Sequence, residues 1–365
     1  MLLEGIFAAV TSPYYPDGRL YLRKLEHNVE RYSRTPLAGM VVLGSTGEAV
    51  MLDDAETREV LRTAALAAAP EKVLLAGIGQ GSAAATLRLA DFAAEQHFDA
   101  VLIRTPHYYG PQMSPLAMLT YYRVVADRSP IPVVLYTIPK FTHYDLATDV
   151  IAELAAHPNI IGLKDSSGDV RKLGEIVSAT RGAATRSTTV TSTFTAVTAR
   201  MLAPLESAAG TGLISADALL SAQSAGATTA ATAVASHPAS AVPAAGLKTR
   251  TREVGFQVLS GVAEKLEVSL SAGATGAVLA MAACAPQACH EVYIAWKEND
   301  PALASEKQQR LVAASSYVAG VLGIAGIKYA CELNGYYGGR PRLPLLPLTG
   351  EQQAEVARLM RDLRN

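Results

Sequence analysis

One lysine of this sequence is placed where a buried amine could do chemistry. Lys164 follows the short apolar run 160–163, and small polar residues open a loop after it. Removing a lysine from water disfavours its ammonium form, and the neutral amine is a nucleophile toward carbonyl carbons. A lysine at the end of a strand can also extend its ammonium into solvent. This stretch alone fits both interpretations.

A tyrosine and a glycine-containing loop occupy matching places in earlier repeats. Tyr136 ends the apolar run 132–136, one repeat before Lys164, so its phenol is expected on the same rim, where it could relay protons. Residues 44–48, Gly-Ser-Thr-Gly-Glu, lie between a predicted strand and a predicted helix. Backbone N–H and hydroxyl groups at such a turn can hold a small anion. Each feature also has a purely structural interpretation, as a packing tyrosine or an ordinary turn.

Other polar residues are less informative. Tyr108 is ambiguous between a site residue and a loop residue, and His107 is interpreted as a loop histidine. Asp53 and Asp165 are interpreted as helix-start or surface acids. The chain contains neither nucleotide-binding glycine motif, and no His, Cys and carboxylate cluster predicts a metal. The amine, the phenol and the hydroxyl-rich loop together favour imine chemistry with a 2-oxo acid.

Composition narrows the class of protein. Half of the 365 residues are apolar, and the formal net charge of −1 argues against nucleic acid or an acidic membrane as main partner. No run of about 18 apolar residues predicts a membrane span, and the N-terminus lacks the basic flank of a signal peptide. The three cysteines, Cys284, Cys289 and Cys331, have neither the number nor the spacing of a disulfide framework. We therefore expect a cytoplasmic enzyme.

Short apolar runs alternate with amphipathic stretches along the chain. Strands are predicted at 6–10, 39–43, 73–77, 100–103, 132–136, 160–164, 256–260 and 275–279. Helices are predicted at about 20–34, 53–69, 82–96, 114–127, 146–156 and 170–180. Uninterrupted Val, Ile and Leu runs indicate parallel strands covered on both faces. Eight such strands predict an α/β fold, a (β/α)8 TIM barrel, which gathers the loops after its strands on one face.

Two regions depart from the repeat. Residues 183–251 are rich in Ala, Thr and Ser, and we interpret them as a low-complexity insertion before strand seven, flexible or weakly helical, with 196–205 as its best helix. As a helix-to-strand connection, it should lie away from the site. The barrel then spans 1–295, and helices predicted at 285–297, 301–321, 324–334 and 351–363 place a C-terminal helical region at 296–365, for packing or oligomerisation.

Four motifs, in order and spacing, resemble the dihydrodipicolinate synthase/N-acetylneuraminate lyase family of class I aldolases. They are the loop 44–48, Thr-Pro-His-Tyr at 105–108, Val-Leu-Tyr at 134–136 before Pro139, and Gly-Leu-Lys-Asp at 162–165. The resemblance covers essentially the whole chain except the insertion.

The resemblance implies a role for each matching residue. Lys164 would be the Schiff-base lysine and Tyr136 the proton-shuttling phenol, while Ser45 and Thr46, with the N–H of Gly47, would hold the substrate carboxylate. Tyr108 would complete a proton relay with Ser45 and Tyr136, typically from a neighbouring subunit. That role implies a homo-oligomer, a dimer or the homotetramer common in the family.

The subtype is judged from fewer residues. Dihydrodipicolinate synthases carry an arginine a few residues after the Tyr-x-x-Pro turn, whereas Phe141 stands here, with Lys140 as a shifted substitute. Segments 129–136, 157–162, 164–170 and 335–339 look closer to 4-hydroxy-2-oxoglutarate aldolase. That resemblance implies that Ser166 contacts the substrate.

The resulting expectation is cleavage of 4-hydroxy-2-oxoglutarate to pyruvate and glyoxylate, with no cofactor because the lysine supplies the electrophile. Condensation of pyruvate with aspartate semialdehyde, as in dihydrodipicolinate synthase, and sugar-acid cleavage are alternatives. A catalytically silent relative that binds a keto acid is the non-enzyme alternative. The joint presence of Lys164, Tyr136 and the loop 44–48 argues against a catalytically silent protein.

Overall fold

The computed structural model describes residues 1–191 and 249–363 of the chain. The chain divides into two compact units, Met1–Thr189 with Thr251–Asn365, and Val190–Arg250. The second unit lies almost entirely outside the described residues, and so does the helix predicted at 196–205. None of the described helices has the length and apolar character needed to cross a membrane.

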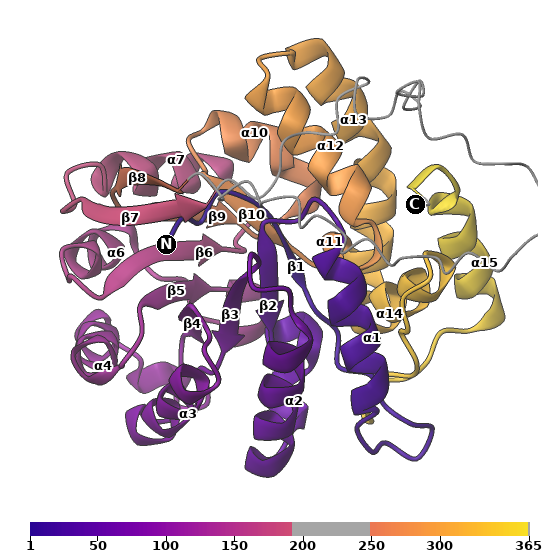
Figure 1. Cartoon of the computed structure of the whole chain (residues 1–365), viewed down its shortest axis with the longest axis horizontal. Helices are drawn as coiled ribbons and strands as arrows, with labels where there is room; N and C mark the ends of the chain where they lie inside the picture. The colour runs from indigo at the N-terminus through magenta and orange to yellow at the C-terminus, as the bar shows by residue number, and fades with distance from the viewer. Residues whose placement is uncertain (192–248, 364–365) are drawn as a thin grey trace, which may run out of the picture. The chain divides into compact units, whose positions relative to one another are not determined.

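Eight parallel strands close into a barrel in the first unit (Figure 1). They are β1 (Gly5–Ala9), β2 (Gly39–Val42), β3 (Val73–Gly77), β4 (Ala100–Arg104), β5 (Val133–Thr137), β6 (Ile160–Asp165), β9 (Gln257–Ser260) and β10 (Gly276–Leu279). Each pairs in parallel with its neighbours, and β10 closes the ring on β1. The predicted (β/α)8 barrel is confirmed, with all eight predicted strands in place.

Helices surround the barrel, as Figure 1 shows. They are α1 (Leu22–Ser33), α2 (Asp54–Ala67), α3 (Ala83–Glu95), α4 (Pro115–Arg128), α6 (Thr148–Ala155), α7 (Val170–Ala179), α10 (Leu266–Ser271) and α12 (Pro286–Lys297). Several begin at side-chain caps, and Asp53 forms a capping box with Glu56 at the start of α2. Asp53 is therefore a helix-start acid, as predicted. The short helix α10 was not predicted, because six residues are too few to show a helical period.

The C-terminal helices belong to the same compact unit as the barrel. They are α13 (Pro301–Ala314), a π-helical segment (Ser315–Val321), α14 (Gly323–Leu333) and α15 (Gly350–Leu359). The single helix predicted over 301–321 is thus α-helical only in its first part. The boundary predicted after residue 295 falls inside α12.

The ends of the predicted insertion are strands rather than flexible or weakly helical chain. β7 (Arg186–Thr191) and β8 (Thr249–Val254) form a two-stranded sheet (Figure 1). Arg186 donates to the carbonyl oxygen of Ile160 at 2.7 Å, and Arg252 pairs with Glu4 at 2.7 Å. Both partners lie where barrel strands begin, so these contacts are at the amino end of the barrel. Lys164 lies at the opposite, carboxyl end of β6, so the two described ends of the predicted insertion lie away from it, while residues 192–248 lie outside the described residues.

Candidate active site

Three polar side chains stand in one row across neighbouring strands. Arg104 at the end of β4 is in register with Tyr136 of β5, which is in register with Lys164 of β6. The residues just before them, Ile103, Leu135 and Leu163, pack in the core outside the barrel. Because side chains alternate along a strand, the row of three projects toward the barrel interior.

Lys164 lines a cavity at this end of the barrel that has both polar and apolar walls. Its side chain is 4% exposed, and Nζ is 4.2 Å from the centroid of the Tyr136 ring. Within the described ranges, no oxygen accepts a hydrogen bond or ion pair from this amine. The cavity has a volume of about 530 Å³. The sequence could not decide between a buried and a solvent-extended lysine, and the structure shows it buried.

The loop after β2 brings hydroxyl groups to the same cavity. Ser45 begins a 3-10 turn (Ser45–Gly47), and its Oγ lies 3.3 Å from the Tyr136 hydroxyl. Thr46 also lines the cavity. The N–H of Gly47, which was expected to bind the substrate carboxylate, donates to the carbonyl oxygen of Gly44 at 3.0 Å in this structure. Ser45 and Thr46 are thus the residues of this turn that face the cavity.

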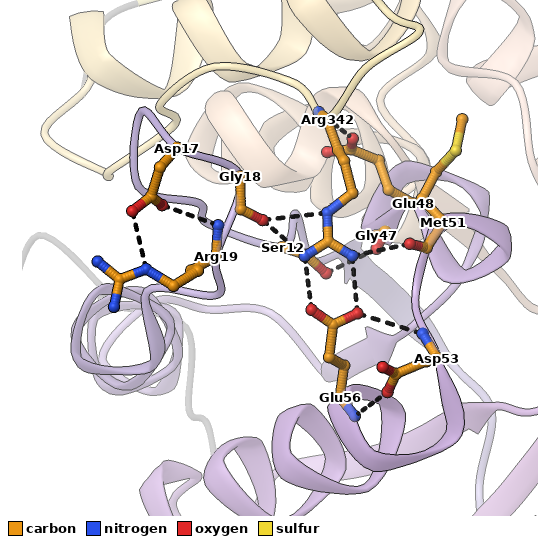
Figure 2. Close-up of polar contacts among 10 residues, drawn as sticks. All are labelled: Ser12, Asp17, Gly18, Arg19, Gly47, Glu48, Met51, Asp53, Glu56 and Arg342. Carbon is orange, nitrogen blue, oxygen red and sulfur yellow. Dashed lines mark hydrogen bonds and ion pairs between the residues drawn. The ribbon is translucent and has the colours of Figure 1, made fainter.

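A buried ion pair anchors this loop to the C-terminal region. Glu48 has a left-handed backbone (φ 54°), and its Oε1 lies 2.5 Å from Nζ of Lys328 in α14. Its Oε2 accepts the backbone N–H of Arg342 at 2.9 Å. The Arg342 guanidinium in turn holds both carboxylate oxygens of Glu56, at 2.6 and 2.7 Å (Figure 2). Residues far along the chain therefore position the loop that carries Ser45.

The C-terminal region also forms part of the cavity wall. Ser315, Gly320 and Ile324 line the Lys164 cavity together with Ser166. The sequence predicted only packing or oligomerisation for this region, since small residues in helices give no local signal of a site. Ser166 packs tightly on Gly261, where an added Cβ would lie 1.9 Å from its Oγ.

The position of Asp165 differs from the one predicted from the sequence. Rather than a surface or helix-start acid, it is 2% exposed, because β6 continues one residue past Lys164. Its carboxylate accepts the N–H and hydroxyl of Ser167 at 3.0 and 2.9 Å. Burial raises the pKa of the Asp165 carboxyl in spite of these hydrogen bonds.

Tyr108 is not part of the site within one chain. It is 84% exposed and packs edge-on against Tyr109, with ring centroids 5.1 Å apart. On the rim of the Lys164 cavity, the ammonium of Lys140 donates to the carbonyl of Gly320 at 2.9 Å. Phe141 is exposed beside it and lines the cavity as well.

Arg104 is a further candidate site residue that was not predicted from the sequence. It lines a second cavity of about 320 Å³, next to the first, together with His107. The signal available was a basic residue at the end of the apolar run 100–103, in the strand position that Tyr136 and Lys164 hold in their own strands. The described residues include no group of three or more His, Cys, Asp or Glu side chains that could hold a metal ion.

The fold and the buried lysine define a (β/α)8 barrel with a cavity at the carboxyl ends of its strands. Residues 2–228 and 244–363 match the sequence profile of the Dihydrodipicolinate synthetase family. The chain belongs to this family.

Curated relatives agree with this assignment. A 4-hydroxy-tetrahydrodipicolinate synthase of Methanothrix thermoacetophila is 26% identical over 97% of this chain and 95% of its own length. The enzyme of that name from Methanoculleus marisnigri is 35% identical over 49% of this chain and 62% of its own. The alignment to that second relative thus covers less than two thirds of the relative's length.

Solved structures share the fold. The dihydrodipicolinate synthase DapA-2 of Bacillus anthracis superposes with a TM-score of 0.76 at 21% identity, covering all of both chains. YagE, a prophage protein of the family from E. coli K12 in complex with pyruvate, gives a TM-score of 0.76 at 23% identity, over 100% and 99% of the two chains. At these identities the likeness concerns the fold.

Proposed function

We propose that this protein is a Schiff-base lyase of the class I aldolase type that forms an imine between Lys164 and pyruvate. The observation that carries the proposal is the buried Lys164 amine, 4.2 Å from the Tyr136 ring, facing a cavity of about 530 Å³. Family membership supports it, and so does the fold shared with a relative solved in complex with pyruvate.

The imine forms and breaks with the residues of the cavity. The Lys164 amine attacks the ketone carbon of the 2-oxo acid, and loss of water leaves a protonated imine. Ser45 and Thr46 receive the neighbouring carboxylate, with Gly47 completing the turn. Loss of a proton from C3 gives an enamine, whose C3 attacks an aldehyde carbon while the aldehyde oxygen takes up a proton through Tyr136. Water then attacks the imine carbon and frees Lys164.

The reverse sequence cleaves a 4-hydroxy-2-oxo acid. Tyr136 takes the proton of the C4 hydroxyl, and the electron pair of the C3–C4 bond moves into the imine as the aldehyde leaves. The enamine takes up a proton at C3, and hydrolysis releases pyruvate. The same residues therefore serve condensation and cleavage.

For the second substrate, the names of the relatives differ from the expectation drawn from the sequence. The curated relatives are named 4-hydroxy-tetrahydrodipicolinate synthase, and none of the comparisons supports the 4-hydroxy-2-oxoglutarate aldolase assignment. Condensation of pyruvate with aspartate semialdehyde is therefore our first candidate. Cleavage of 4-hydroxy-2-oxoglutarate is the second, favoured by Phe141 at the place where the synthases are expected to carry an arginine, and Ser166 would contact the substrate in that case.

Borohydride trapping tests the imine. The protein is incubated with pyruvate, reduced with borohydride, and digested for mass spectrometry. We expect one adduct, on Lys164, and none in Lys164→Arg. Lys140→Gln is the matched control, because Lys140 lies on the rim of the same cavity and should leave the adduct in place. Absence of an adduct, or an adduct on another lysine, would refute the mechanism.

Product assays then separate the two candidates. Pyruvate with aspartate semialdehyde is followed by consumption of pyruvate, and 4-hydroxy-2-oxoglutarate is followed by release of glyoxylate. Glyoxylate release without condensation would reverse our order of preference.

Tyr108 is proposed to act across a subunit interface in a homo-oligomer. Its exposure in the single chain leaves it accessible to a second copy. Analytical ultracentrifugation of the protein, with Tyr108→Phe assayed beside it, tests this role. A fully active monomer would contradict it.

A further inference from the structure

The cavity that contains Arg104 adjoins the Lys164 cavity. The two share the lining residues Ser45, Tyr136, Ile138, Phe141 and Ile324. The hydrogen-bonded pair Ser45 and Tyr136 lies on the shared wall, at an Oγ to hydroxyl distance of 3.3 Å. A substrate attached to Lys164 that is longer than pyruvate therefore meets Tyr136 first and the Arg104 cavity next.

Arg104 lines this second cavity as a half-buried cation that has no anionic partner among the described residues. Across residues 1–191 and 249–363, no carboxylate or carbonyl oxygen accepts a hydrogen bond from its guanidinium. Burial lowers the pKa of the Arg104 guanidinium, and the nearby groups that interact with it include the phenols of Tyr121, Tyr122 and Tyr136. The backbone makes room for it at Gly79, where an added Cβ would lie 3.0 Å from Cγ of Arg104. A desolvated guanidinium is costly to leave unpaired, which favours an anion beside it.

The other ionisable groups lining this cavity do not neutralise Arg104. The carboxylate of Glu48 is occupied by Lys328 and by the N–H of Arg342. The pKa of His107 is lowered from 6.5 by burial, by Arg104 and by His143, so its imidazole is a neutral hydrogen-bonding group at physiological pH. Most of the remaining wall is apolar, including Leu102, Met51 and Leu345. The positive charge of the guanidinium is thus the uncompensated charge of this pocket.

We propose that Arg104 binds a carboxylate at the far end of a dicarboxylic substrate whose ketone carbon is held by Lys164. This inference rests on the proposed function and narrows its substrate class. Arg104 and Lys164 are two strands apart, roughly 10 Å between their backbones at a strand spacing of about 4.8 Å. Arg104 lines one of the two adjoining cavities and Lys164 the other, and Tyr136, which lies between them in the row, lines both.

The forked guanidinium suits a carboxylate, which it can hold with two parallel hydrogen bonds. 4-Hydroxy-2-oxoglutarate carries a second carboxylate beyond the reacting carbons, and the adduct of Lys164-bound pyruvate with aspartate semialdehyde is likewise a dicarboxylic 2-oxo acid. Sugar acids that lack a second carboxylate have no anionic group to pair with the Arg104 guanidinium. Arg104 would therefore determine specificity without taking part in the bond-making steps.

A matched pair of ligands tests this assignment. 2-Oxoglutarate and 2-oxopentanoate both have five carbons and differ in the terminal carboxylate. For each, the concentration giving half-maximal borohydride trapping on the full chain is measured by intact mass. Wild type should require less 2-oxoglutarate than 2-oxopentanoate. Arg104→Gln should raise the 2-oxoglutarate concentration by about 10- to 100-fold, as for a lost charge-assisted hydrogen bond.

Controls identify a specific effect. In Arg104→Gln, the concentrations for pyruvate and 2-oxopentanoate should stay at the wild-type values, and Arg104→Lys should lie between wild type and Arg104→Gln for 2-oxoglutarate. Arg88→Gln, at an exposed arginine of α3, should change nothing. Circular dichroism shows that each variant is folded. Inorganic phosphate and chloride are added separately to wild type, and selective competition with 2-oxoglutarate at millimolar concentration would place a free anion in the same position.

Three results would overturn the proposal. Equal weakening of both five-carbon acids would make Arg104 a structural residue. An unchanged preference for 2-oxoglutarate in Arg104→Gln would show that the terminal carboxylate binds at another residue. Phosphate binding lost in Arg104→Gln, without any preference for 2-oxoglutarate in wild type, would make this an inorganic-anion site. If pyruvate itself is not trapped, the imine mechanism fails separately, and titration calorimetry with 2-oxoglutarate still tests Arg104.

Discussion

Replacing Lys328 by methionine should destabilise the first compact unit strongly, because it leaves the Glu48 carboxylate buried without its cation. The side chains are 0% and 1% exposed, and Nζ and Oε1 are 2.5 Å apart. Removing one member of a buried pair typically costs about 3–5 kcal/mol. The loop carrying Ser45 should loosen as well, raising the pyruvate concentration needed for half-maximal trapping.

The converse variant, Glu48→Gln, should cost less. Burial already lowers the pKa of the Lys328 ammonium although Glu48 opposes this shift, so without the carboxylate the lysine can release its proton. An unfolded state that binds more protons makes stability rise with pH, here up to the ordinary lysine value of 10.5. The cost of Glu48→Gln should therefore shrink between neutral pH and pH 10, whereas that of Lys328→Met should not.

The double variant Lys328→Met with Glu48→Gln should recover much of the stability. It removes both charges, and the amide oxygen of the introduced glutamine can still accept the N–H of Arg342. The carbonyl of Arg340, which Lys328 reaches at 3.0 Å, loses its partner at a cost of about 1 kcal/mol. A coupling energy of about 2 kcal/mol or more is expected.

Urea unfolding provides the assay, with the fluorescence of Trp296, the single tryptophan of the chain, as reporter. The exposed pair Arg171 and Glu175 is the control, and Arg171→Met should cost less than about 1 kcal/mol. A Lys328→Met cost no larger than that control would refute the reasoning. A double variant less stable than both single variants would refute it too.

Three further predictions concern packing and pH. Gly162→Ala should destabilise the fold by about 1–3 kcal/mol and lower trapping at Lys164, because the new Cβ would lie 2.4 Å from the carbonyl oxygen of Gln257; unchanged melting would contradict this. The three cysteines should resist a thiol reagent at pH 8 until urea unfolds the chain, since they are buried and burial raises the pKa of two of them to about 12; rapid native labelling would be inconsistent with that burial. The hydrogen bond from Arg342 lowers the pKa of Glu56, so this contact stabilises the fold above the ordinary value of 4.5 and the contribution is lost as pH falls through the lowered value. Glu56→Gln should therefore flatten the acid side of the stability profile, and an unchanged profile would exclude the contact as its cause.

The strands and most helices could be predicted because their signals are local. An uninterrupted apolar run such as that before Lys164 specifies a strand buried on both faces, wherever its partners lie in the chain. A helix cap such as Asp53 needs only the residues that follow it. Tyr136 and Lys164 could be placed on one rim because parallel strands in a barrel end on the same face.

The sequence by itself thus determined the barrel and the candidate lysine, tyrosine and loop, since strand length, apolar pattern and order along the chain suffice for them. Only the tertiary structure decided which groups complete the site. The ion pair joins Glu48, just after β2, to Lys328 in α14, and most of the barrel strands lie between these two residues in the sequence. The row formed by Arg104, Tyr136 and Lys164 depends on the register of three strands. Register and long-range ion pairs arise from packing between distant segments, which no local pattern of residue types encodes.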